Sequence, residues 1–372
     1  MKISLIILAT CIFILNAMPV MSHHGRSNFR YDINTTLEGE VVDFQWRNPH
    51  VYIDLQTIND NNETEVWLIE AGTPSALKRQ GWNKYAFGIG DKIVAVGNAN
   101  RDPEKKHLYL QHIVLESGKT LSLASTKRLL EIERGNVVNT DLISPEAETK
   151  KSNSEPVVTP SKDFSGTWAR GPNNYLTTAY FEPPVGWPLT ERGEQQLGRF
   201  DELDNPAYDC LDRGLPFFTV MPYWLTWTRY EDRIEIELQN VNIIRTLYFN
   251  LDEHPVDLTP NLVGHSIARF DEDGSLLVDT VSFSTTRWGL APGVDSSEQK
   301  RISERYTLSE DGLGMDISIT FTDPAYLTEP LTVNGSYRKV ADTLFEPYQC
   351  DIEAARRSLS PQPKIPWYPL FP

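Results

Sequence analysis

The chain has little positive charge, few cysteines and no apolar run long enough to cross a membrane comfortably. Lys and Arg number 35 against 51 Asp and Glu, which gives a formal net charge of −16 over 372 residues. This shortage argues against nucleic acid as a partner, because binding to it depends on clustered Lys and Arg that displace counterions. It argues equally against attachment to an anionic membrane surface.

Several familiar catalytic motifs are also missing. The sequence has no Gly-x-Ser-x-Gly turn around a nucleophile, no His-Glu-x-x-His zinc motif and no Gly-rich phosphate loop.

The N-terminal segment is typical of a secretory signal. Lys2 gives a positive start, residues 3–15 are apolar almost throughout, and Ser22 provides a small residue at a cleavage site. We therefore expect a periplasmic or secreted protein with no membrane span after signal removal. Its first residues would be His23 and His24.

Two of the three cysteines remain after the signal is removed. Cys11 lies inside the signal, which leaves Cys210 and Cys350. An even pair in an oxidising compartment predicts a disulfide. This bridge would tie the start of the second domain to its end.

Composition divides the chain into five parts. We expect a signal peptide at 1–22, a first domain at 23–123, a short helix and flexible linker at 124–162, a second domain at 163–352 and a proline-rich tail at 353–372. Both domains are strand-rich, so the predicted fold class is all-β.

The order of elements predicts two different barrels. The first domain shows strands at 36–44, 51–58 and 65–70, a helix at 74–80, and strands at 92–97 and 108–115. This β-β-β-α-β-β order is that of a small OB-like barrel. In the second domain, polar and apolar residues alternate along many consecutive strands, which favours a larger antiparallel, lipocalin-like barrel.

The N-terminal part resembles an uncharacterised family of small exported proteins of Gram-negative bacteria. The resemblance rests on the His-His start and on the Trp-x-Asn-Pro-His motif at 46–50, and it covers residues 23–122. It implies no activity.

The C-terminal part resembles a second uncharacterised exported family over residues 164–350. The shared residues are Gly-His-Ser-Ile-Ala-Arg at 264–269 and the segment 274–280, although Phe270 and Asp271 replace the usual Trp-Glu. Gly-Thr-Trp at 166–168 is similar to the start of lipocalin-like barrels. That resemblance implies a late arginine, here Arg338, packed over the tryptophan.

Three histidines form the first candidate site. The amine and ring of an N-terminal His23 can chelate a metal, and His50 or His24 can add a further nitrogen. Neutral imidazole and amine nitrogens suit Cu(II). The set predicts a copper site; the alternative is a polar terminus and a turn residue.

A second candidate site joins His265, Asp279 and Glu304, which fall on three predicted strands. If they face the interior, the histidine and a carboxylate form an acid–base pair. Arg245 or Arg305 would hold an anionic group or stabilise an oxyanion there. The alternative is a structural network, because buried polar groups need partners in any barrel.

Aromatic residues are predicted to line the second barrel, among them Trp168, Trp224 and Trp227. They suit a small, largely apolar ligand and equally an ordinary core. Binding of such a molecule is the leading expectation, with copper at the mature N-terminus. The alternatives are an acid–base enzyme of the isomerase or hydratase type and a periplasmic copper-handling protein.

Overall fold

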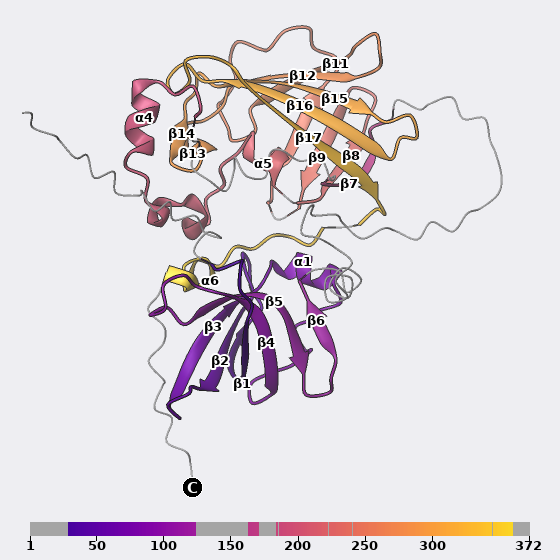
Figure 1. The fold of residues 1–372 in the computed structure, drawn as a ribbon. Coiled ribbons are helices and arrows are strands. Elements are labelled where there is room, and N and C mark those ends of the chain that lie inside the picture. The colour runs from indigo at the N-terminus through magenta and orange to yellow at the C-terminus, as the bar shows by residue number, and fades with distance from the viewer. Residues whose placement is uncertain are drawn as a thin grey trace, which may run out of the picture.

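The structure, a computed structural model, describes residues 29–123, 163–170, 184, 186–221, 223–239, 241–343 and 345–359. It contains two β-barrels, one from each half of the chain (Figure 1). The predicted all-β class is confirmed. The predicted signal peptide, the linker at 124–162 and the tail beyond residue 359 lie outside the described residues.

The first barrel is the OB-like barrel expected from the order of its elements. These elements are β1 (Thr35–Gln45), β2 (Tyr52–Ile58), β3 (Thr64–Glu70), α1 (Pro74–Arg79), β4 (Lys92–Ala99), β5 (His107–Leu115) and β6 (Thr120–Ser122). β1 pairs with β2 and β4, and β3 pairs in parallel with β5, which closes the barrel. Helix α1 lies between the third and fourth strands, as predicted.

Local sequence explains these elements. Ile53 and Leu55 are fully buried on alternate positions of β2, so their face of the strand fills the barrel. Helix α1 begins after Thr73, whose hydroxyl accepts the N–H of Ala76 at 3.2 Å.

The second barrel is larger and is closed by nine strands. They are β7 (Gly166–Arg170), β8 (Leu225–Arg229), β9 (Arg233–Leu238), β10 (Ile244–Tyr248), β11 (His265–Phe270), β12 (Leu276–Val281), β15 (Arg301–Leu308), β16 (Gly314–Thr322) and β17 (Leu331–Val340). All neighbours are antiparallel except β10 and β11, which run parallel. The prediction of an antiparallel barrel is therefore corrected at this pair, because the long loop 249–264 carries the chain back before β11 begins.

The remaining elements surround the second barrel. They are α4 (Glu191–Leu197), η1 (Glu202–Asp204), η2 (Pro206–Asp209), α5 (Phe217–Val220), β13 (Thr286–Ala291), β14 (Val294–Ser296), α6 (Ile352–Ala355) and η3 (Arg357–Leu359). None of the helices in these described ranges is both long and apolar enough to cross a membrane.

The interior of the second barrel is filled by large side chains. Trp168 and Trp227 have 0% and 1% of their surface exposed. The cation over the Trp168 ring is Lys339, whose Nζ lies 5.5 Å from the ring centroid. The resemblance had pointed to Arg338. In the register of β17 against β7, Lys339 is the residue opposite Trp168.

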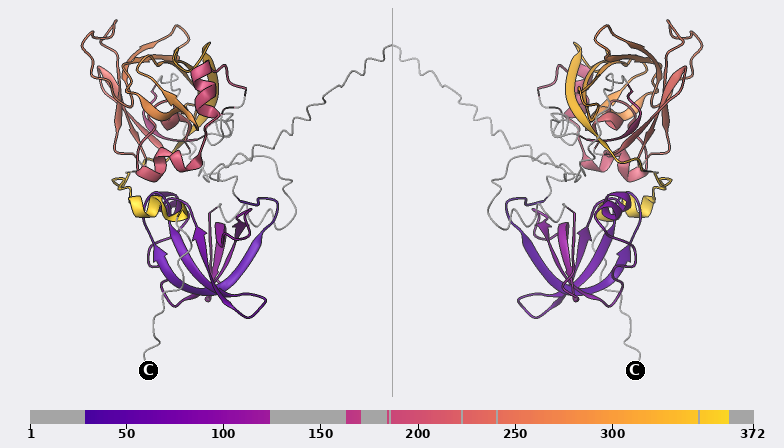
Figure 2. Two further views of the ribbon diagram at one scale, coloured as in Figure 1. Left: turned by 90° about the vertical axis from the view of Figure 1, so that its left-hand side faces the viewer. Right: turned by 90° about the vertical axis from the view of Figure 1, so that its right-hand side faces the viewer.

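A C-terminal segment joins the two barrels. We call residues 345–359 the C-terminal strap; α6, which belongs to it, lies between the barrels in Figures 1 and 2. Its first anchor is the predicted disulfide between Cys210 and Cys350, which is confirmed. Its second anchor is on the first barrel, where the guanidinium of Arg357 pairs with Asp54.

A second contact between the barrels involves helix α1. Arg79 donates to Oε1 of Gln239 at 2.9 Å, and its guanidinium lies 4.5 Å from the ring centroid of Trp224. Trp224 therefore packs against the first barrel and does not line the interior of the second.

Candidate functional site

The first candidate site lies on the first barrel, where one carboxylate joins two histidines. Nδ1 of His50, just before β2, lies 2.7 Å from Oε1 of Glu70, the last residue of β3. Nε2 of His107, the first residue of β5, lies 3.0 Å from Oε2. We call these three residues the His50 cluster. The His50 side chain is 40% exposed and that of His107 only 8%.

The proton positions in the His50 cluster follow from the charge of Glu70. Burial alone would raise the pKa of this carboxyl, but His50 and His107 more than offset it and hold the pKa well below its usual range. An ionised carboxylate only accepts hydrogen bonds. The Nδ1–H of His50 therefore donates to Glu70, and in the neutral form of the ring the lone pair is on Nε2.

This arrangement supports His50 without forming a metal site by itself. Glu70 uses one oxygen on each histidine, which is how carboxylates orient metal-binding histidines from behind. Within the described ranges, no group of three or more His, Cys, Asp or Glu is arranged to hold a metal ion. His23 and His24 lie outside those ranges, so the predicted copper set is untested.

The strap holds the loop that carries His50. Asn48 pairs with Cys350, and its carbonyl accepts the N–H of Asp351 at 3.1 Å. Arg47 adds an ion pair, with Nη1 at 3.1 Å from Oδ2 of Asp351. The disulfide therefore anchors a segment two residues away from His50.

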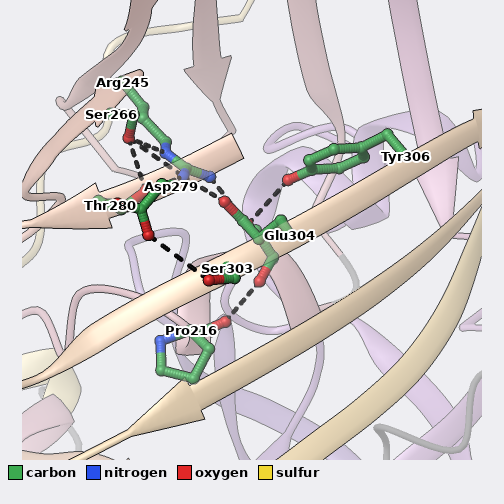
Figure 3. Close-up of polar contacts among 9 residues, drawn as sticks. Pro216, Arg245, Ser266, Asp279, Thr280, Ser303, Glu304 and Tyr306 are labelled. Atoms are coloured by element: carbon green, nitrogen blue, oxygen red, sulfur yellow. Dashed lines mark hydrogen bonds and ion pairs between the residues drawn. The ribbon is translucent and has the colours of Figure 1, made fainter. Parts of the chain in front are cut away.

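A buried polar network occupies the second barrel. Nη1 of Arg245 lies 3.0 Å from Oε1 of Glu304, and its Nη2 also pairs with Oε2 (Figure 3). The guanidinium donates to the hydroxyls of Ser266 at 3.2 Å and Thr280 at 2.9 Å. Tyr306 donates to Oε1 of Glu304 at 2.9 Å. Arg245 is thus fully engaged with protein partners.

His265 and Asp279 are not part of this network. Ser266 and Thr280 are buried, so strand alternation turns the preceding residues, His265 and Asp279, to the outer face. Figure 3 shows the Asp279 carboxylate directed toward Ser303, whose hydroxyl lies 3.5 Å away. The expectation that both residues share the interior with Glu304 is therefore wrong.

The two outer-face residues are instead connected through a third one. Nε2 of His254, in loop 249–264, lies 3.1 Å from Oδ2 of Asp279. Its Nδ1 lies 2.9 Å from Nδ1 of His265. Asp279, His254 and His265 form a continuous chain, which we call the outer relay. Because Asp279 and His265 contact opposite nitrogens of His254, the three cannot share one metal ion.

The remaining predicted ligand-binding residues have other partners. Arg305 faces outward and pairs with Asp271 at 2.8 Å and Asp273 at 2.5 Å in the turn between β11 and β12. Trp168 and Trp227 are buried in the core of the barrel, with at most 1% of their surface exposed.

Two cavities lie at the edges of the second barrel. One, of about 320 Å³, is lined by Asp163, Phe164, Arg229, Ile234 and Phe270. The other, of about 480 Å³, runs along β10 and loop 249–264 and ends at His265. We call it the outer groove.

Sequence reasoning missed Glu70, His107 and His254. The contact between Glu70 and His107 could have been predicted. An OB-like order places the third and fifth strands side by side and brings the end of one near the start of the other. His254 carried no signal, since it lies in an irregular loop.

Comparison with known families supports the N-terminal resemblance. Residues 12–109 match the model of a family of unknown function, DUF6152. The match extends through β4 to the start of β5. A comparison with curated proteins found no match. The resemblance predicted for the C-terminal part stays a prediction.

Proposed function

We propose that this is an exported copper-binding protein whose site combines the mature N-terminus with His50. The observation that carries the proposal is the pair formed by Glu70 and His50. Their contact of 2.7 Å at Nδ1 leaves Nε2 of a partly exposed ring as a nitrogen ligand. Metal-binding histidines are commonly supported in this way.

The chain supports a site shared with residues 23 and 24. The ring of Phe29 contacts that of His107 with 4.8 Å between centroids, so the described chain begins beside the His50 cluster. His24 precedes Phe29 by five residues, and five extended residues span up to about 17 Å. This length supports the proposal that residues 23 and 24 approach the His50 cluster.

Nitrogen ligands favour Cu(II) over other divalent ions. His23 would contribute its amine and ring, His50 its Nε2, and His24 is the alternative donor. Copper bound there would supply redox or metal-delivery chemistry. The confirmed disulfide fits an exported protein, and the predicted location is the periplasm or the medium.

Titration of the mature protein with Cu(II) tests this proposal. We expect one tight site, and His50→Gln should weaken it at least tenfold because a ligand is lost. His112→Gln, five residues beyond His107 on β5, is the matched control and should bind as the wild type does. Equal affinity in all three proteins would refute the role of His50.

Binding of a small apolar molecule is the second candidate. It is supported by the cavity of about 320 Å³, where Phe164 and Phe270 provide apolar walls. The guanidinium of Arg229 lies 5.5 Å from the Phe270 ring centroid and could hold an anionic end group. Dodecanoate is a suitable probe. Arg229→Gln should weaken its binding, whereas Tyr85→Ala, on the exposed surface of the first barrel, should not.

A further inference from the structure

The outer relay has a defined direction. Asp279 accepts the Nε2–H of His254, so Nδ1 of His254 has no proton in the neutral ring. That nitrogen accepts the Nδ1–H of His265 across 2.9 Å. Nε2 of His265 is therefore left as an unprotonated base at the end of the chain.

Neighbouring groups hold His265 in this state. Tyr248 stacks on its ring with 5.2 Å between centroids and 15° between planes. Burial, followed by the proximity of His254, lowers the pKa of His265 below its ordinary value. Among the residues that the structure describes, the other charged group in contact with the relay is Arg301, whose Nη2 lies 3.5 Å from Oδ2 of Asp279. The ring is thus neutral at neutral pH and can accept a proton.

His265 also lines the outer groove, and the other groove residues carry no charge. Aliphatic residues such as Ile244 and Leu258 alternate there with the hydroxyls of Thr246, Tyr248 and Thr259. A groove of about 480 Å³ with this lining suits an uncharged molecule of moderate size that has a polar group.

We propose that the outer groove is an acid–base site in which Nε2 of His265 moves a proton of a neutral carbonyl compound. The lone pair takes a proton from the carbon next to the carbonyl, the C–H electron pair forms the C–C double bond of an enolate, and the π pair of the carbonyl moves onto its oxygen. A groove hydroxyl donates a hydrogen bond to that oxygen. The imidazolium then returns the proton to the γ-carbon, so a β,γ-unsaturated ketone becomes its α,β-unsaturated isomer with no other reactant.

Asp279 and His254 are positioning residues in this step. They do not touch the substrate. They hold His265 in the tautomer that exposes Nε2, and Asp279 stabilises the positive charge that forms on the relay. This site is independent of the proposed copper site, because it uses no residue of the first barrel.

The test uses 3-cyclohexen-1-one, with formation of 2-cyclohexen-1-one followed by absorbance in the presence of a chelator. His265→Gln should lower the rate by about 10²–10⁴-fold, the usual contribution of a general base. Asp279→Asn should lower it by at least about tenfold. Asp316→Asn, at an exposed position of β16, is the matched control and should leave the rate unchanged.

The pH dependence of the rate distinguishes a positioning role of Asp279 from a role in folding alone. Wild-type rates should rise with pH through the lowered pKa of His265 and then level off, and Asp279→Asn should change the position of this rise. Deuterium exchange of the α-protons of cyclohexanone, followed by NMR, measures proton removal without isomerisation. The proposal is overturned if neither reaction exceeds the buffer rate, or if His265→Gln matches the wild type in both.

Discussion

Arg245 and Glu304 form a two-point ion pair inside the second barrel, with Nη1 3.0 Å from Oε1 and both side chains at most 2% exposed. Such a pair loses hydration when it is buried, and much of its attraction only offsets that loss. The effect of the pair on the free energy of unfolding should therefore be largest when only one of the two partners is removed.

Removing one partner should lower the free energy of unfolding more than removing both. We expect Glu304→Gln or Arg245→Met to lower the free energy of unfolding by about 3–5 kcal/mol, because each leaves buried polar groups without their counter-charge. The double variant Arg245→Met with Glu304→Leu should be more stable than the worse single variant. Urea unfolding measures all four proteins, and simple additivity of the two losses would contradict this account.

Lys300 should make the free energy of unfolding depend on pH in the neutral to alkaline range. It is 1% exposed, its Nζ donates to the carbonyl of Leu215 at 2.7 Å, and burial lowers its pKa to about 7. Between this value and the unfolded pKa of about 10.4, the unfolded chain binds more protons, so stability rises with pH.

The comparison with Lys300→Met isolates this effect. From pH 7.5 to 9.5, the wild type should gain stability relative to the variant by at most about 1.4 kcal/mol per pH unit. Denaturant midpoints at both pH values provide the measurement. Parallel pH dependence in the two proteins would show that Lys300 has an ordinary pKa.

The disulfide should stabilise the strap more than the barrels. Replacing both Cys210 and Cys350 with serine should lower the free energy of unfolding by roughly 2–5 kcal/mol, because the closed loop is long. The contacts of Asn48 with the strap should weaken at the same time. Hydrogen exchange should therefore speed up at Asp351 before it does so in the barrel strands; uniform acceleration would argue against a local role for the bridge.

Glu70 should affect copper affinity without being a ligand. Glu70→Gln removes the carboxylate that accepts the Nδ1–H of His50, and loss of such a supporting group typically weakens metal binding by about 10–100-fold. Cu(II) titration of the folded variant measures this loss. An unchanged affinity would mean that His50 binds no copper or needs no orientation.

Local pattern predicted the first barrel well but could not predict strand direction everywhere. Alternation and turn residues located five of its six strands, β1 to β5, with ends that differ by at most two residues, and missed only the short β6. The parallel pairing of β10 with β11 has no local signature, because alternation of side chains is the same in parallel and antiparallel strands.

The candidate site in the second barrel shows the same limit. On β15, Glu304 alternates with polar residues and shares the buried face of Ile302 and Tyr306, so its inward position could be predicted. On β12, Leu277 and Val278 are both apolar, and the pattern does not say which face Asp279 joins. The contact of Asp279 with His254 depends on a loop whose path the sequence does not encode locally.

The most direct test of copper binding is the intact mass of the exported protein, purified from the periplasm with and without added Cu(II). We expect a chain that begins at His23 and retains one copper ion after removal of excess metal. A chain that begins elsewhere, or a correctly processed chain that retains no copper, would contradict this expectation.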